Sequence, residues 1–126
     1  MNSGTSEGPV GAEGDQTIQT VIRALTEHKA NDVVVLDLRQ LSDATDFFVI
    51  ASGSSDTHVR ALAEQVLEAC QKEGRRPHHI EGLTGGRWVL LDYVDFVVHV
   101  FHPSLRDFYQ LERLWADAPH SASARP

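Results

Sequence analysis

The stretch GRWVLLDYVDFVVHVF, residues 86–101, decides the fold because it predicts two neighbouring β-strands joined by a short turn. Most of its residues are β-branched, aromatic or otherwise apolar, which favours strands. If Val94 and Asp95 form a two-residue turn, Leu91 lies opposite Val98. Because cross-strand partners share one face of a sheet, this register assigns every side chain of the hairpin to a face.

The two predicted faces of the hairpin differ in composition. One face is almost wholly apolar and is expected to pack on helices; it carries Val89, Leu91, Tyr93, Phe96, Val98 and Val100. The other face, called the mixed face below, carries Trp88, Leu90, Asp92, Val97, His99 and Phe101. A sheet covered by helices on one side often leaves its other side open, and aromatic anchors dominate interface energies. The mixed face therefore predicts a site where another protein docks.

Three alternatives stay open for the mixed face. A further strand or a helix could cover it, with Asp92 and His99 satisfying each other in the interior. The face could instead be the self-interface of a dimer. The register could also differ, because a valine at position 94 disfavours the positive φ of a tight hairpin turn. A three-residue turn would move the side chains of the second strand to the opposite faces.

The other segments predict helices and strands interleaved in one domain, with apolar residues at helical spacing or in continuous runs. A serine at position 54 or 55 is expected to cap the second helix, and Gly74 to end it. The order α-β-β-α-β-β-β-α predicts an α/β fold with a compact mixed sheet of about five strands and three helices. Besides the hairpin, we expect a helix at 16–30, strands at 33–38 and 46–52, a long helix opened by residues 53–55 and stopped by Gly74, a strand at 77–82 and a last helix from 103.

Chain length and composition fit one domain flanked by two tails. The chain has 126 residues, and we expect disordered tails at 1–14 and 117–126 around a domain at 15–116. A single cysteine, Cys70, allows no internal disulfide, which favours a reducing compartment. The first residues have neither the basic nor the apolar region of a secretory signal, and no apolar run is long enough for a bilayer. We therefore expect a cytoplasmic protein without membrane association, and Met1 favours a bacterial one.

The acidic charge balance narrows the class of partner. The formal net charge is −7, which disfavours binding to nucleic-acid phosphates, because such binding needs clustered lysine and arginine. An acidic protein suits a basic protein partner, since complementary charge speeds encounter and orients the complex. Solubility alone also explains an acidic surface.

The sequence offers few residues in patterns typical of a catalytic or metal site, so we expect no catalytic residue, no metal and no cofactor. His99 and His102 lie three apart on a predicted strand, which places them on opposite faces. The alternative is a nucleotidyltransferase-like enzyme or a nucleotide-binding protein, because Gly53 and Ser54 join a strand to a helix and could cradle a phosphate. The paired carboxylates that would hold metal ions are missing, however, since the next strand offers Glu81 alone.

Four ordered motifs together resemble the ribosomal silencing factor family, also called the Iojap family. They are DVVVLDL, TDFFVIASG, the hairpin, and R-x-F-Y-x-L-E-x-L-W at 106–115. The resemblance implies a nucleotidyltransferase-like fold without catalytic residues. It also implies a translation repressor that binds the large ribosomal subunit through its ribosomal protein fourteen. Occupying that surface would sterically block association with the small subunit. Members of the family are often homodimers.

The resemblance also assigns residues to the partner-binding site. Trp88 would be the anchor and Glu81 an acidic contact, whereas the helical spacing of Tyr109 is more typical of a core residue. The family pattern also carries Thr45, Asp46, Ser52 and Gly53, which we interpret as turn and cap residues. The full set expected to bind the partner is Glu81, Gly82, Trp88, Asp92, His99 and Tyr109.

Overall fold

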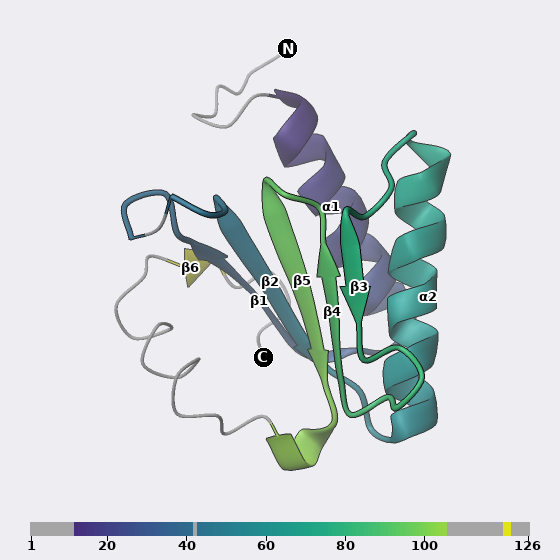
Figure 1. Ribbon diagram of the computed structural model, residues 1–126. Helices are drawn as coiled ribbons and strands as arrows, with labels where there is room; N and C mark the ends of the chain where they lie inside the picture. Colours follow the sequence, from purple (N-terminus) through teal and green to yellow (C-terminus); the bar gives the residue numbers. More distant parts are fainter. Residues whose placement is uncertain (1–11, 42, 106–119, 122–126) are drawn as a thin grey trace.

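The computed structural model describes residues 12–41, 43–105 and 120–121 of the chain. Two helices and five of the strands follow the predicted order along the sequence (Figure 1). The elements are α1 (Ala12–Glu27), β1 (Asn31–Asp37), β2 (Phe47–Ser52), α2 (Asp56–Lys72), β3 (His79–Glu81), β4 (Trp88–Asp92), β5 (Phe96–Phe101), the 3-10 turn η1 (Pro103–Leu105) and β6 (His120–Ser121).

The strands form one mixed sheet in the order β3-β4-β5-β2-β1-β6. β2 and β5 are parallel, and the other neighbouring pairs are antiparallel. The predicted mixed α/β sheet is therefore confirmed. Its two-residue sixth strand was not predicted, because it belongs to a segment that the sequence assigns to a tail. The first residues of the third predicted helix form the 3-10 turn η1, and the rest of that prediction lies outside the described residues.

Both helices cover the same face of the sheet (Figure 1). Their apolar stripes pack on the face of the hairpin that was predicted to be apolar, and the resulting core is almost fully excluded from water. Within α2 the buried residues are Val59, Leu62, Ala63, Val66 and Cys70, as the helical spacing predicts. Burial of these side chains supplies the main driving force for folding.

Local sequence signals explain where α2 begins and ends, but they misplace the start of α1. The Ser55 hydroxyl accepts a hydrogen bond from the His58 N–H at 3.1 Å, which caps α2. Gly74 follows the helix with a φ of +77°, a conformation that glycine adopts without strain. Helix α1 instead starts at Ala12, four residues before the predicted start and inside the predicted tail at 1–14.

The hairpin has the predicted register, because Leu91 is paired with Val98. Its turn is nevertheless strained: Val94 has a φ of +77°, which a β-branched residue rarely adopts. The Asp95 N–H donates to the Tyr93 carbonyl at 3.0 Å, so Val94 is the centre of a γ-turn. The Asp92 carboxylate accepts the Val94 N–H at 2.8 Å and holds this turn in place.

Val94→Gly is expected to stabilise the protein by about 1 kcal/mol, because glycine adopts a positive φ without steric conflict. Little packing is lost, since Val94 is 57% exposed. Urea denaturation of the two proteins measures the difference. Val94→Ala is the control; it keeps a Cβ and should gain less. A glycine variant less stable than the unaltered chain would contradict the assignment of strain to this turn.

Candidate functional site

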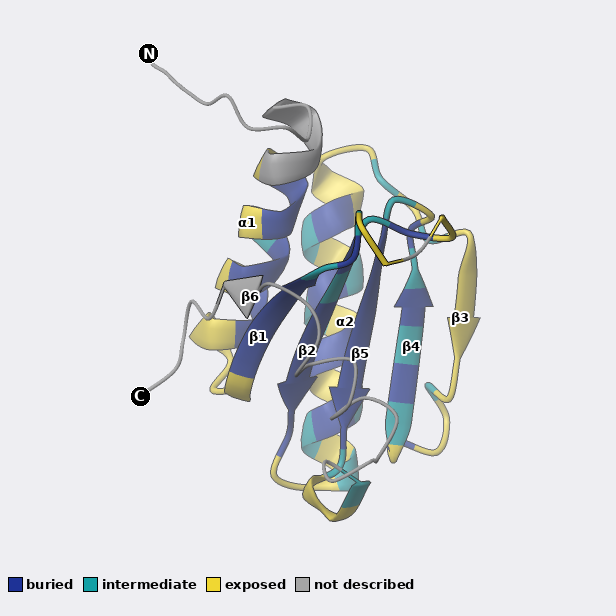
Figure 2. Ribbon diagram, turned by 90° about the vertical axis from the view of Figure 1, so that its left-hand side faces the viewer, coloured by how far each residue is buried: buried dark blue, intermediate teal, exposed yellow. Residues whose placement is uncertain are grey.

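The mixed face extends beyond the hairpin onto all five main strands. Residues paired across β3 and β4 share a face, so His79 and Glu81 lie beside Asp92 and Leu90. On the other side of β5, the parallel pairing with β2 adds Phe48 and Ile50 to this face, and β1 then adds Val34 and Leu36. Figure 2 looks onto this face, with the helices behind the sheet.

Exposure on the mixed face changes from one edge of the sheet to the other (Figure 2). β3 is exposed, and the mixed-face residues of β4 are partly exposed. On β5, by contrast, His99 is 4% exposed and Phe101 is 1% exposed. The expectation of an open face is therefore wrong for β5, where Phe101 joins a second apolar cluster with Val34, Leu36, Leu38 and Ile50. The candidate docking surface reduces to β3, β4 and the adjoining pocket described below.

Trp88 and His99 are directly connected. The Trp88 indole Nε1 donates to His99 Nδ1 at 3.1 Å, and the Trp88 ring also contacts Phe101 with centroids 4.9 Å apart. Since an indole N–H only donates, Nδ1 must be the acceptor, and the neutral His99 ring carries its proton on Nε2. Trp88 is thus partly a packing residue and not a freely projecting anchor.

Burial keeps His99 neutral. Desolvation lowers the pKa of His99 from 6.5 to about 4, because the charged imidazolium would lose its hydration in the sheet. Its Nε2 is buried and has no hydrogen-bond partner in the part of the chain that the structure describes. The alternative in which Asp92 and His99 satisfy each other is therefore not observed. His99 offers one neutral, unused donor.

The two acidic candidates have different roles. Glu81 is exposed and is hydrogen-bonded to His79, with 2.7 Å between the His79 Nε2 and a carboxylate oxygen. Such an exposed pair contributes little to stability, so Glu81 is available to a partner. Asp92 is partly buried and uses one oxygen to support the turn at Val94.

Gly82 has a steric role, whatever its part in binding. It has a φ of +79°, and a Cβ placed there would lie 2.0 Å from the Trp88 carbonyl oxygen. Only glycine allows the chain to pass so close to β4. Gly82 therefore positions Trp88 and β3 relative to each other. Tyr109, the remaining candidate, lies outside the described residues.

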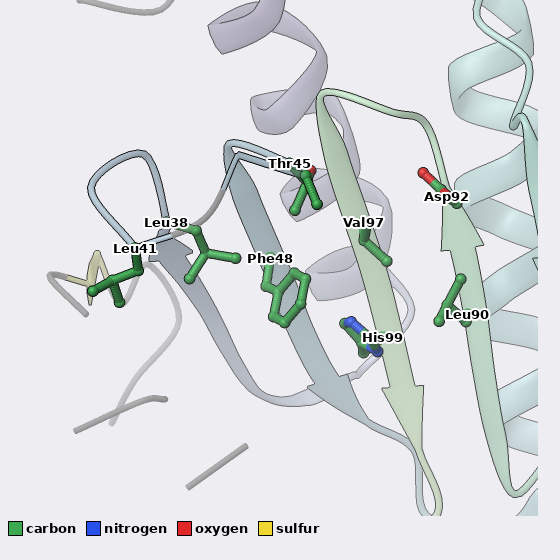
Figure 3. A pocket seen from close by; sticks show the side chains of 9 residues that line it. Leu38, Leu41, Thr45, Phe48, Leu90, Asp92, Val97 and His99 are labelled. Atoms are coloured by element: carbon green, nitrogen blue, oxygen red, sulfur yellow. The ribbon is translucent and has the colours of Figure 1, made fainter. Parts of the chain in front are cut away.

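A pocket of about 310 Å³ opens on the mixed face beside β4 and β5 (Figure 3). Thr45 lines it, and the Thr45 hydroxyl is buried without a hydrogen-bond partner among the described residues, so the expected side-chain cap is not observed. Sequence reasoning missed the pocket because the loop before β2 supplies much of its wall. The lining residues are Leu38, Leu41, Ala44, Thr45, Phe48, Leu90, Asp92, Val97 and His99.

The Gly53–Ser54 element does not form a phosphate cradle. The Gly53 N–H donates to the Phe101 carbonyl at 3.0 Å, and the Ser54 N–H donates to His58 Nδ1 at 2.9 Å. Both amides are therefore already used. Asp56 adds a negative charge to the first turn of α2, which opposes an anionic ligand there.

Two features are absent from the described residues 12–41, 43–105 and 120–121. In these ranges, no group of three or more His, Cys, Asp and Glu side chains is placed to hold a metal ion. Within the same ranges, neither helix has the length and apolar character needed to span a membrane.

The fold and the mixed face together define an α/β protein with a candidate protein-binding surface. A family model described as "Ribosomal silencing factor during starvation" matches residues 12–125. The chain belongs to this ribosomal silencing factor family. The family resemblance of the four sequence motifs is thereby confirmed.

Individual relatives agree with the family. The chain is 40% identical over 104 residues to "Ribosomal silencing factor RsfS" of Halalkalibacterium halodurans, covering 82% of this chain and 89% of that protein. It is 30% identical over 112 residues to mouse "Mitochondrial assembly of ribosomal large subunit protein 1", covering 84% of this chain and 47% of the mouse protein. A crystal structure of protein CV0518 from Chromobacterium violaceum matches with a TM-score of 0.77 and 33% identity, covering 88% of this chain and 92% of that one.

Proposed function

We propose that this protein represses translation by binding the large ribosomal subunit through its ribosomal protein fourteen and by sterically blocking the small subunit. Family membership supports the ribosomal role, and the name of the mouse relative refers to the large subunit. The observation that carries the docking mode is the partly exposed outer half of the mixed face, where Glu81, Trp88 and Leu90 lie together.

Charge supports this assignment of partner. Proteins that contact ribosomal RNA are rich in basic residues, and this chain has a formal net charge of −7. Glu81 is exposed at the edge of the docking surface, where it can steer a basic partner. Occupancy alone would produce the effect, so the mechanism needs neither turnover nor a cofactor, and it is suited to the cytoplasm of a bacterium. Self-association as a homodimer would compete for the same surface if it used β3 and β4.

A subunit-joining assay tests the proposal. Separated subunits are mixed with the protein under conditions that favour joining, and joined ribosomes are measured on a sucrose gradient. The protein is expected to reduce the joined fraction when it is added before mixing. Joining that proceeds equally with and without a saturating amount of folded protein would contradict the proposal.

Glu81→Lys is expected to weaken this inhibition about tenfold, because it reverses the charge facing a basic partner. Stability should change by less than about 0.5 kcal/mol, since Glu81 is exposed. Glu68→Lys is the matched control; it makes the same charge change at an exposed position on α2, on the opposite side of the sheet. Equal inhibition by the two variants would show that β3 is not part of the docking surface.

A nucleotide with magnesium is expected to leave the melting temperature unchanged, because the amides of Gly53 and Ser54 are already hydrogen-bonded. A ligand that binds only the folded state raises the melting temperature, and the rise grows with the logarithm of its concentration once that exceeds Kd. Differential scanning fluorimetry with and without the nucleotide, and with magnesium alone, makes the comparison. A concentration-dependent rise would favour the nucleotide-binding alternative.

A further inference from the structure

The pocket on the mixed face combines apolar walls with two buried polar atoms that have no hydrogen-bond partner within residues 12–41, 43–105 and 120–121. Part of its wall is formed by Leu38 and Leu41, from the connection between β1 and β2, and by Phe48 of β2 (Figure 3). The two polar atoms are His99 Nε2 and the Thr45 hydroxyl oxygen. A buried polar group without a partner costs free energy, so an arrangement of this kind favours a ligand that supplies the missing hydrogen bonds.

The donor at His99 has a fixed chemistry. The hydrogen bond from Trp88 holds Nδ1 as an acceptor, so Nε2 carries the proton. Phe48 packs edge-on against the imidazole with ring centroids 4.5 Å apart, which further fixes the ring. Nε2 can therefore only donate, and its complement is a neutral oxygen acceptor such as a peptide carbonyl.

Charge excludes two other kinds of occupant. None of the described lining residues is a lysine or an arginine, and Asp92 adds a carboxylate, so the pocket disfavours an anionic group. A cationic head group would not satisfy the His99 donor. The apolar walls instead suit an aliphatic side chain, because burying its methylene groups away from water is favourable.

We propose that this pocket receives one aliphatic side chain of the protein partner, together with a neighbouring backbone carbonyl that accepts a hydrogen bond from His99. The inference rests on the proposed function and names the chemistry by which the partner is held. The pocket shares Leu90 and Asp92 with the docking surface on β4, so a partner seated on that surface reaches it directly. Central, desolvated pockets of this kind carry most of the energy of an interface.

A neutral dipeptide mimic tests the pocket without knowledge of the partner. N-acetyl-leucine N-methylamide carries an aliphatic side chain between two carbonyl groups, and N-acetyl-glycine N-methylamide lacks the side chain. In an NMR titration of the full chain, the leucine compound should shift the amide signals of Thr45, Leu90 and Val97. Equal shifts with both compounds, or none with either, would overturn the inference. Shifts at these residues on raising the protein concentration alone would identify a second copy as the occupant and would also overturn it.

A pair of variants connects the pocket to ribosome binding. Ala44→Leu fills the pocket from an exposed position in its wall, and Ala61→Leu makes the same change at an exposed position on α2. We expect Ala44→Leu to abolish the shifts and to weaken large-subunit binding on the order of tenfold, whereas Ala61→Leu leaves both unchanged. If Ala44→Leu binds large subunits as tightly as the unaltered chain, the inference about the pocket is overturned and the proposed function still stands. Absence of binding by the unaltered chain would overturn the proposed function itself, and the inference with it.

Discussion

Trp88→Ala is expected to lower the free energy of unfolding by about 2–3 kcal/mol, in addition to any effect on binding. Trp88 packs against the second apolar cluster and stacks obliquely on Phe101. Removing the indole also deletes the N–H that His99 Nδ1 accepts, which leaves a buried acceptor unsatisfied. The measurement is urea denaturation of the two proteins at the same pH.

Trp88→Phe separates packing from hydrogen bonding. Phenylalanine keeps an aromatic ring against Phe101 but donates no hydrogen bond to His99. The free energy of unfolding should therefore fall by only about 1 kcal/mol in this variant. A change below about 0.5 kcal/mol in the alanine variant would show that Trp88 projects freely and is a simple anchor. For this reason a loss of ribosome binding in Trp88→Ala alone does not identify a contact, and Glu81→Lys is the better probe.

Acidification is expected to destabilise the protein specifically through His99. The pKa of His99 is lowered to about 4 by burial, whereas an unfolded histidine titrates near 6.5. Above pH 6.5 the His99 ring is neutral in both the folded and the unfolded chain, so its contribution to stability is fully present. As the pH falls towards 4, the unfolded chain binds a proton that the folded chain refuses, so stability is lost. Between pH 6.5 and pH 4 the free energy of unfolding falls by roughly 3 kcal/mol through His99.

A comparison with His99→Phe isolates this contribution. The variant keeps an aromatic ring and cannot titrate, while the other histidines and the carboxylates, including Asp92 in the same pocket, are unchanged. Urea denaturation from neutral pH down to 4 should therefore show a steeper loss in the unaltered chain. Parallel pH profiles for the two proteins would mean that His99 is hydrated in the folded state.

The sequence predicted those parts of the fold that local patterns control. Alternation along the hairpin gave the correct register, so Leu91 faces Val98 as expected. The serine cap and Gly74 bounded α2 because both act within a single turn of helix. The strained φ at Val94 shows that long-range pairing overrode an unfavourable turn residue.

Other features depend on contacts between distant segments and leave no local signal. His99 contacts Phe48 of β2, Trp88 of β4 and Phe101 of β5, which the order of strands in the sheet brings together. The pocket was missed for the same reason, since Thr45 and Leu41 come from the connection before β2. Gly82 was assigned to the binding site by resemblance, and only the backbone geometry reveals its close approach to Trp88.

Co-sedimentation with separated ribosomal subunits tests the central claim most directly. The unaltered protein, Glu81→Lys and Glu68→Lys are each spun with large or small subunits at low and moderate salt. The account predicts that the protein pellets with large subunits only, that Glu81→Lys is weakened, and that Glu68→Lys binds normally. Failure of the folded protein to bind large subunits, or equal binding to both subunits, would contradict it.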